Sequence, residues 1–254
     1  MKILITGGSS GIGKDMAKIL AKKENEIIIV ARDENKLNET KKELEKAGAN
    51  VTCIVSDLSK EENCIEIHKK VQNVDILINN AGFGDCGSFE KTNLEKEINM
   101  IKTNIIAYHI LTKLYLIDMK KKNSGKILNV ASIAGFMPGP LMATYYATKS
   151  YVVRLSEAIR EELKKEKSKV QISILCPGRV ATNFNKVANV KFKIREAKSI
   201  DVAKYAIKNL EKGKFYIVPG LDVKLAKMGA KIFPTKLVGK VAYMVQKRKL
   251  GGEN

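Results

Sequence analysis

The sequence is poor in the residues that build metal sites and disulfide frameworks. It has no tryptophan, and only two of its 254 residues are histidines. Its four cysteines lie far apart, with no CxxC pair: Cys53, Cys64, Cys86 and Cys176. Because neither the spacing of a zinc site nor that of a disulfide-rich protein is present, we expect reduced thiols and no bound metal.

Long apolar runs are also missing. No stretch approaches the ~18 consecutive apolar residues of a membrane-spanning helix. Met1 and Lys2 lead directly into a strand-like segment, so we see no signal peptide and expect a cytoplasmic protein. A length of 254 residues, with 44% hydrophobic and 29% charged residues, fits one large globular domain better than two small ones.

Acidic residues are scarce relative to basic ones. Lys and Arg number 46 against 27 Asp and Glu, a formal net charge of +19, and residues 186–254 hold 17 basic against 5 acidic residues. Such a charge suits nucleic acid, but no basic stretch contains stacking aromatic residues and the lysines are spread along amphipathic helices. We therefore expect no nucleic-acid binding. The field would favour a phosphate-bearing cofactor or an acidic substrate.

The order of the apolar segments predicts the fold. Short apolar runs alternate with segments of helical period, the pattern of a parallel sheet whose strands are buried on both faces. We expect an α/β, Rossmann-like, doubly wound parallel sheet of about seven strands with helices on both faces. The expected strands include 3–5, 26–31, 51–55, 74–78, 126–131 and 170–175. The longer expected helices are 35–47, 94–122 and 145–167.

A glycine-rich turn follows the first expected strand. It reads Thr6-Gly7-Gly8-Ser9-Ser10-Gly11-Ile12-Gly13 and leads into a helical pattern. A strand, a glycine-rich turn and a helix N-terminus in this order form a phosphate-binding site, because backbone N–H groups can approach an anion that the helix dipole also favours. The alternative is a tight strand-to-helix turn with no ligand.

The end of the second strand bears on the choice of cofactor. In dinucleotide folds an acid at this position holds a ribose 2′-hydroxyl, whereas an arginine holds a 2′-phosphate. Arg32 follows the strand, which favours NADP(H) over NAD(H). The alternative is that Arg32 is a surface residue and that Asp33 is the ribose acid.

Two polar residues follow the next two strands. Asp57 and Asn80 come at the carboxyl ends of the third and fourth strands, where ligands of such sheets bind. Their side chains could hold an adenine and fix the loop, or they could be turn and cap residues.

An acid/base pair is expected on the helix that begins near Tyr145. Tyr145 and Lys149 are four residues apart, so their side chains lie on one helical face and can converge. A cation beside a phenol lowers its pKa, which suits a catalytic acid or base. Ser132 follows a strand at the same edge of the sheet, and Asn104 is a poor helix-interior residue that needs a partner or exposure.

From residue 2 to about 220 these motifs resemble the short-chain dehydrogenase/reductase family, in order and spacing. The resemblance implies Tyr145 as proton donor or base, Lys149 as the group that lowers its pKa and holds the ribose, Ser132 as hydrogen-bond donor to the substrate oxygen, and Asn104 as the anchor of a water. It also implies these cofactor-binding residues: Gly7, Ser9, Ser10, Gly11, Ile12, Gly13, Arg32, Asp57, Leu58, Asn80, Ala81, Gly82, Tyr145, Lys149, Pro177, Gly178, Val180 and Thr182.

The implied activity is NADP(H)-dependent interconversion of a ketone and a secondary alcohol, as in carbonyl reductases and hydroxysteroid dehydrogenases. Five residues suggest an apolar pocket for a steroid-like, bile-acid-like or small carbonyl substrate, or else ordinary loop packing: Phe83, Phe136, Met137, Met142 and Phe184. A 3-oxoacyl-(acyl-carrier-protein) reductase is the enzymatic alternative, and an NADP(H)-binding sensor or scaffold is the non-enzymatic one. The family resemblance also implies a homodimer or homotetramer that shares the helices around Asn104 and Tyr145.

Beyond the expected catalytic domain (1–220), residues 221–254 form a basic extension. Two apolar sets recur at helical spacing on either side of Pro234: Leu221, Leu225, Met228 and Ile232, then Leu237, Val241, Met244 and Val245. Two amphipathic helices of this kind could pack on another subunit, cover the active site or lie on an anionic membrane. Packing against protein is the favoured interpretation.

Overall fold

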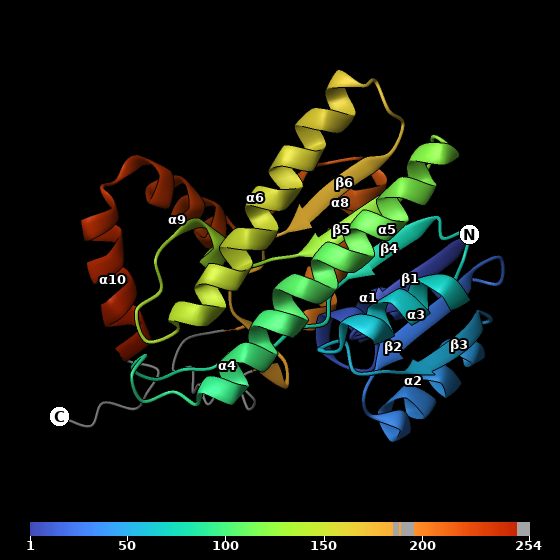
Figure 1. The fold of residues 1–254 in the computed structure, drawn as a ribbon, viewed down its shortest axis with the longest axis horizontal. Coiled ribbons are helices and arrows are strands. Elements are labelled where there is room, and N and C mark those ends of the chain that lie inside the picture. The colour runs from blue at the N-terminus through green and yellow to red at the C-terminus, as the bar shows by residue number, and fades with distance from the viewer. Residues whose placement is uncertain (185–187, 189–195, 248–254) are drawn as a thin grey trace.

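The protein is described by a computed structural model that covers residues 1–184, 188 and 196–247. Its main sheet has seven strands: β1 (Lys2–Thr6), β2 (Glu26–Ala31), β3 (Asn50–Val55), β4 (Ile76–Asn79), β5 (Lys126–Val130), β6 (Gln171–Leu175) and β9 (Tyr216–Ile217). The order is β3-β2-β1-β4-β5-β6-β9, and all neighbours run parallel (Figure 1). The predicted doubly wound parallel sheet is therefore confirmed. A separate short pair is formed by β7 (Val180–Ala181) and β8 (Ala197–Lys198).

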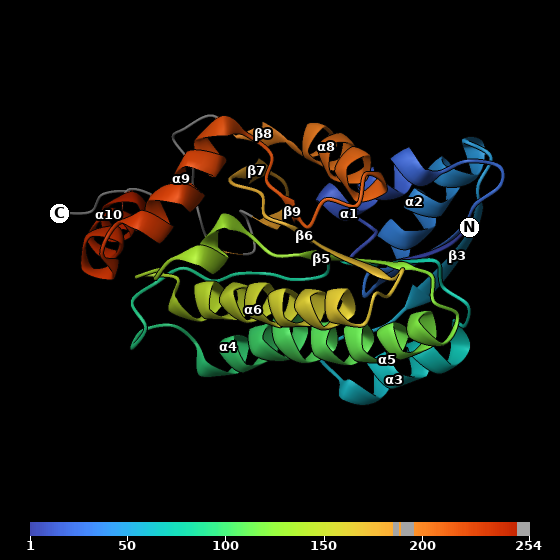
Figure 2. The same cartoon turned by 90° about the horizontal axis from the view of Figure 1, so that it is seen from above.

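Helices cover both faces of the sheet, as Figure 2 shows. One face carries α3 (Glu61–Lys70), α4 (Leu94–Ile101), α5 (Ala107–Lys121) and α6 (Ala143–Lys165). The other carries α1 (Gly11–Leu20), α2 (Glu34–Lys46) and α8 (Ser199–Glu211). A 3₁₀ turn, η2 (Ile133–Phe136), connects β5 toward α6.

The alternation of side chains along each strand divides the core into two layers. On β1, Leu4 packs in the layer with Tyr108 of α5, whereas Ile3 and Ile5 pack in the layer with Met16 of α1. All three β1 side chains are fully buried. Burying each one contributes roughly 1.5–3 kcal/mol, which is why these strands form continuous apolar runs.

The order of strands places the site. The chain leaves β1 toward β2 and β3, then returns to the other side of β1 with β4. The carboxyl ends of β1 and β4 therefore border a crevice at this switch point, where ligands of open parallel sheets bind.

The helix expected from 94 to 122 is present. A π-helical turn, η1 (Lys102–Ile106), joins α4 to α5 within it. Asn104 lies inside it, is fully buried and uses its side-chain amide away from the helix. A π turn widens the helix by one residue, and such turns are frequent at functional sites. Helical periodicity alone does not reveal this insertion.

The C-terminal region forms two helices, α9 (Leu221–Ile232) and α10 (Thr235–Lys247). They separate at Pro234, as the sequence predicts. Both lie at the end of the molecule opposite the N-terminus (Figure 1). Across the described residues, no helix combines the length and apolar character needed to cross a bilayer.

Candidate functional site

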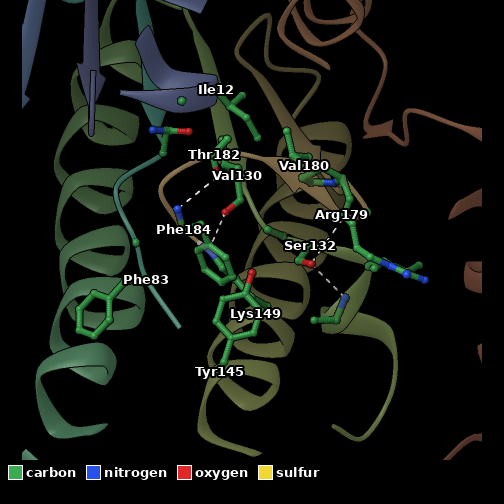
Figure 3. A pocket seen from close by; sticks show the side chains of 18 of the residues that line it. Ile12, Phe83, Val130, Ser132, Tyr145, Lys149, Arg179, Val180, Thr182 and Phe184 are labelled. Atoms are coloured by element: carbon green, nitrogen blue, oxygen red, sulfur yellow. Dashed lines mark hydrogen bonds between the residues drawn. The ribbon is translucent and has the colours of Figure 1, made fainter. Parts of the chain in front are cut away.

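A cavity of about 950 Å³ opens at the carboxyl ends of the strands. It is bordered by the glycine-rich turn, by η2, by the start of α6 and by α9 and α10. All the site residues predicted from the sequence line this cavity except Gly13 and Asn104. Figure 3 shows Ser132, Tyr145 and Lys149 close together in it. The residues predicted from the sequence are therefore brought together at one cavity, and their roles stay predictions.

The glycine-rich turn fits a phosphate group. Gly7 and Gly11 have φ angles of +66° and +53°, a backbone conformation that favours glycine. Ser10 is the N-cap residue of α1, but its side chain makes no capping hydrogen bond. The first N–H groups of α1 thus lack a side-chain cap, and the first two residues that carry them, Gly11 and Ile12, line the cavity.

Gly13 has a structural role instead of lining the cavity. A Cβ at this position would lie 2.3 Å from Asn80 Nδ2 and 2.4 Å from the Gly7 carbonyl oxygen. Asn80 Nδ2 donates hydrogen bonds to the carbonyl oxygens of Thr6 and Gly7, each at 3.1 Å. The absence of a side chain at Gly13 therefore lets Asn80 tie β4 to the glycine-rich turn. Of the two roles that the sequence offered for Asn80, the structure displays the fixing of the loop.

Asp57 is held by the turn that follows it. Its Oδ1 accepts a hydrogen bond of 3.0 Å from the Ser59 N–H. Burial raises the pKa of Asp57, but the Ser59 amide and hydroxyl, helped by Arg32 and Lys60, outweigh it and hold that pKa below its usual value. An ionised carboxylate therefore faces the same cavity as Arg32.

The two residues after β2 have different positions. Asp33 is the N-cap of α2, where its carboxylate accepts from the Lys36 backbone N–H at 3.1 Å and from Lys36 Nζ at 2.6 Å. These bonds lower the pKa of Asp33. Arg32 is exposed and lines the cavity with Lys36, a residue that the sequence analysis did not single out. Asp33 lines the same cavity, so both residues that the sequence offered for the ribose border it.

Tyr145 faces the hydroxyl of Ser132. Burial raises the pKa of Tyr145, and the nearby Ser132 hydroxyl acts in the opposite direction but does not outweigh it. The Ser132 hydroxyl also accepts from the Ala134 N–H at 3.2 Å. The phenol is therefore held protonated beside a second hydroxyl, which is the arrangement of a proton donor.

Lys149 is held by a main-chain carbonyl group. Its Nζ donates to the Val130 carbonyl oxygen at 2.9 Å and lies 5.8 Å from the centroid of the Tyr145 ring. Lys149 is 4% exposed, and burial lowers its own pKa to about 8. Its predicted effect on the pKa of Tyr145 stays a prediction.

The shifted pKa of Lys149 predicts a pH-dependent stability. Between pH 8 and pH 10 the unfolded lysine binds more protons than the folded one, so the free energy of unfolding rises with pH in this window. In Lys149→Met this contribution is gone. We expect the wild type to gain on the order of 2 kcal/mol relative to the variant from pH 8 to pH 10. Urea unfolding of both proteins at each pH measures it, and a constant difference would contradict the shift.

Asn104 supports the cavity from behind. Its Nδ2 donates to the Phe83 carbonyl oxygen at 2.9 Å and to Thr148 Oγ1 at 3.1 Å, and its Oδ1 accepts from the Phe83 N–H at 3.1 Å. A Cβ on Gly82 would lie 2.9 Å from this Oδ1. The side chain therefore fixes the loop after β4, which answers the need for a partner. Its predicted role with water stays a prediction.

The apolar residues are divided between cavity and core. Phe83, Met137, Met142 and Phe184 line the cavity, as the sequence suggested. Phe136 does not, since it packs against the core beside Tyr216. Residues 185–187 and 189–195, which follow Phe184 and which the sequence suggests as a loop beside the substrate, fall outside the described residues.

The second tyrosine of the helix has a partner that was not foreseen. Tyr146 lines the cavity, and its hydroxyl accepts a hydrogen bond from Gln246 Nε2 of α10. Burial raises the pKa of Tyr146 to about 12. Gln246 shares the buried face of α10 with Ala242, so helical period indicates this face. No local signal in the sequence indicates its partner, 100 residues away.

The helices α9 and α10 complete the cavity wall. Residues from both helices line the same cavity as Tyr145: Asp222, Val223, Ala226, Gly229, Ala230, Phe233, Leu237, Val238, Val241, Ala242 and Val245. The sequence allowed this extension to pack on another subunit, to cover the active site or to lie on a membrane. In the structure it lies against the cavity that contains Tyr145.

Comparison with known proteins agrees with this geometry. A family model described as short chain dehydrogenase matches residues 1–191. The chain is similar to a ketoacyl reductase, HetN, of Nostoc sp., with 32% identity over 183 residues that cover 70% of this chain and 63% of that protein. It is also similar to the very-long-chain 3-oxoacyl-CoA reductase of Anas platyrhynchos, with 33% identity over 201 residues, 74% of this chain and 62% of that protein.

The fold has close structural counterparts. A short-chain dehydrogenase from Sphingobium yanoikuyae, solved in complex with NADPH, superposes with a TM-score of 0.81 at 25% identity, covering 91% of this chain and 94% of that one. The matched segments span less than two thirds of the length of both curated relatives. The family model covers β1 to β6 and ends before α8, β9, α9 and α10.

Proposed function

This chain belongs to the short-chain dehydrogenase family, and from that premise we propose that it is an NADP(H)-dependent oxidoreductase interconverting a hydrophobic ketone and its secondary alcohol. The observation that carries this proposal is the pairing of Tyr145 and Ser132 in one cavity with the glycine-rich turn. Two hydroxyl groups at one point are what a reacting carbonyl oxygen requires.

The proposed chemistry follows from those two groups. The nicotinamide, when bound, supplies the hydride that adds to the carbonyl carbon. Tyr145 donates its phenolic proton to the oxygen as negative charge develops there, and Ser132 donates a hydrogen bond to the same oxygen. The raised pKa of Tyr145 keeps that proton in place for reduction. Lys149 and Asn104 hold the surrounding backbone through Val130 and Phe83, and we assign ribose binding to Lys149 as well.

Several residues would hold the cofactor. The first N–H groups of α1, with Ser9 and Ser10, suit the pyrophosphate, and Asp57 with Asn80 lies on the path toward the adenine. The remaining proposed contacts are with residues that line the cavity: Gly7, Gly11, Ile12, Leu58, Ala81, Gly82, Pro177, Gly178, Val180 and Thr182. Gly13 acts through Asn80. Preference for NADP(H) is proposed on the exposed guanidinium of Arg32.

Arg32→Ala tests that preference. The loss of a charge-assisted contact with the 2′-phosphate, about 1.5–3 kcal/mol, is expected to weaken NADPH binding by about 10- to 100-fold. NADH, which lacks the phosphate, should bind within about twofold of its wild-type affinity. Fluorescence titration with both cofactors measures this. Arg154→Ala, on the exposed face of α6, is the control. Equal loss for NADPH and NADH would assign Arg32 a structural role.

The substrate class rests on the apolar part of the cavity. Met137, Met142 and Phe184 line it, and α9 and α10 add further apolar residues to its wall. A steroid-like or other bulky ketone suits this wall. The names of the relatives favour 3-oxoacyl thioesters as the second candidate, and the basic surface suits an acidic carrier protein.

NADPH oxidation against ketosteroids, aryl ketones and acetoacetyl thioesters tests the reaction and separates these classes. If NADPH binds and no ketone is turned over, the non-enzymatic alternative, a sensor or scaffold, gains. We also propose a homodimer or homotetramer whose subunits meet through the helices of the α4–α6 side. The protein would be cytoplasmic, with a catalytic domain of residues 1–220 followed by the extension of residues 221–254.

A further inference from the structure

Exposed apolar side chains concentrate on α9 and α10. Of the 16 large hydrophobic residues that are exposed in the described part of the chain, nine lie between residues 221 and 244. Four of them, Leu221, Leu225, Met228 and Ile232, are 54–76% exposed and recur every three or four residues of α9. They therefore form one stripe along that helix, which we call the α9 stripe.

The α9 stripe is not the face that α9 presents to the protein. Val223, Ala226 and Ala230 of the same helix line the cavity, and in helical projection they lie opposite the stripe. Helix α9 therefore has apolar side chains on two faces: one faces the protein, and the other, the α9 stripe, faces solvent. An apolar stripe of this kind marks an interaction site.

The polar residues of both helices are almost all lysines. Residues 221–247 contain Lys224, Lys227, Lys231, Lys236, Lys240 and Lys247 against a single acid, Asp222. None of these lysines forms an ion pair with any residue that the structure describes. Lys227 lies over the Tyr216 ring, 3.1 Å from its centroid. The surface beside the stripe is therefore cationic.

The cavity opens within the same pair of helices. Phe233, Leu237 and Val241 line the cavity that contains Tyr145, yet they are 56%, 47% and 48% exposed. Side chains that both line a cavity and meet solvent lie at its mouth. The opening at these residues is thus apolar and lies beside the α9 stripe and the lysines, whereas the exposed Arg32, Asp33 and Lys36 mark a separate, polar opening of the same cavity.

We propose that α9 and α10 dock this protein on an anionic lipid bilayer, with the α9 stripe among the acyl chains and the lysines at the headgroups. The apolar opening of the cavity then faces the bilayer, and an apolar ketone dissolved there enters without crossing water. The docking stands on the surface alone, whereas the entry of substrate rests on the proposed function.

The lysines and the α9 stripe together favour an anionic bilayer over a protein partner. A second copy of the chain, related by a two-fold axis, would place the lysines of one α9–α10 pair against those of the other. An acidic protein would neutralise the lysines but bring polar side chains to the α9 stripe. A bilayer with anionic headgroups answers both features at once.

Vesicle flotation of the full chain tests the docking. We expect binding to phosphatidylcholine vesicles that contain phosphatidylglycerol to be at least about tenfold stronger than binding to phosphatidylcholine alone, and weaker at high salt. Leu225→Asp/Ile232→Asp should reduce binding at least about tenfold, since two charges enter the apolar stripe. The matched control is Val55→Asp/Ile65→Asp, on exposed positions of β3 and α3, which adds the same charge and should bind as the wild type.

The outcomes are separable. Equal loss in both double variants, or no binding of the wild type to either vesicle, overturns the docking. Light scattering tests a contact between copies of the chain. If the wild type binds no vesicles and only Leu225→Asp/Ile232→Asp forms a smaller assembly, this face is an interface between subunits. NADPH oxidation with a water-soluble ketone, measured without vesicles, tests the proposed reaction independently. Its retention in the α9 variant, with loss of turnover of a vesicle-embedded ketone, supports entry from the bilayer.

Discussion

Tyr145→Phe is expected to lower kcat for ketone reduction by about 10³-fold or more, because the variant removes the proton donor and leaves the ring in place. The phenol is the group that faces Ser132 in the cavity, and its raised pKa keeps it protonated in reduction. The ring also contacts Phe184, with centroids 5.2 Å apart, and phenylalanine preserves this contact. NADPH affinity should therefore change by less than about threefold.

Steady-state kinetics and a binding titration on the same preparation check this expectation. Tyr151→Phe is the matched control, since it removes a phenol from the same helix that pairs with His109 instead of facing the cavity. Turnover by Tyr145→Phe within tenfold of the wild type would assign the proton transfer to another group. A parallel loss of NADPH binding would instead indicate a damaged site.

Ser132→Ala is expected to lower kcat/KM by about 10²- to 10³-fold, the usual cost of removing one hydrogen-bond donor from a developing oxyanion. Ser132 is 7% exposed and begins η2, where its hydroxyl accepts from the Ala134 N–H. Its position is thus set by the backbone and does not depend on the substrate. Ser132→Thr keeps the hydroxyl and should retain more activity than Ser132→Ala.

The pH dependence of alcohol oxidation by Ser132→Ala distinguishes a catalytic role of Ser132 from a purely structural one. The Ser132 hydroxyl opposes the burial that raises the pKa of Tyr145. Without it, the apparent pKa for alcohol oxidation, in which Tyr145 must lose its proton, should move upward in Ser132→Ala. An unchanged profile with unchanged kcat would show that Ser132 only shapes the turn. Ser150→Ala, which removes a hydroxyl bonded within α6, is the control.

The sequence predicted most of the fold and of the site because both are encoded locally. Strands such as Ile3–Ile5 are continuous apolar runs, and the cavity residues follow strand ends, where the topology of a parallel sheet must bring them together. Tyr145 and Lys149 share a helical face whatever surrounds them. Each of these inferences needs only spacing and residue type.

The features that were missed depend on contacts between distant segments. Asn104 occupies a π turn because Phe83 and Thr148 take its amide, and neither is near in sequence. The pKa of Lys149 follows from burial and the Val130 carbonyl, which spacing does not report. The cavity wall from α9 and α10 depends on how the extension folds back, since helical period indicates two faces and not their partners.

The central claim is hydride transfer from NADPH to a ketone in the Tyr145 cavity, and deuterium transfer measures it most directly. The wild-type protein is incubated with NADPH deuterated at both C4 positions and with one ketone from each class, and the alcohols are analysed by mass spectrometry. We predict an alcohol of one class that carries a single deuterium on its carbinol carbon, and none with Tyr145→Phe. Saturating NADPH binding with no deuterium in any alcohol would contradict the claim.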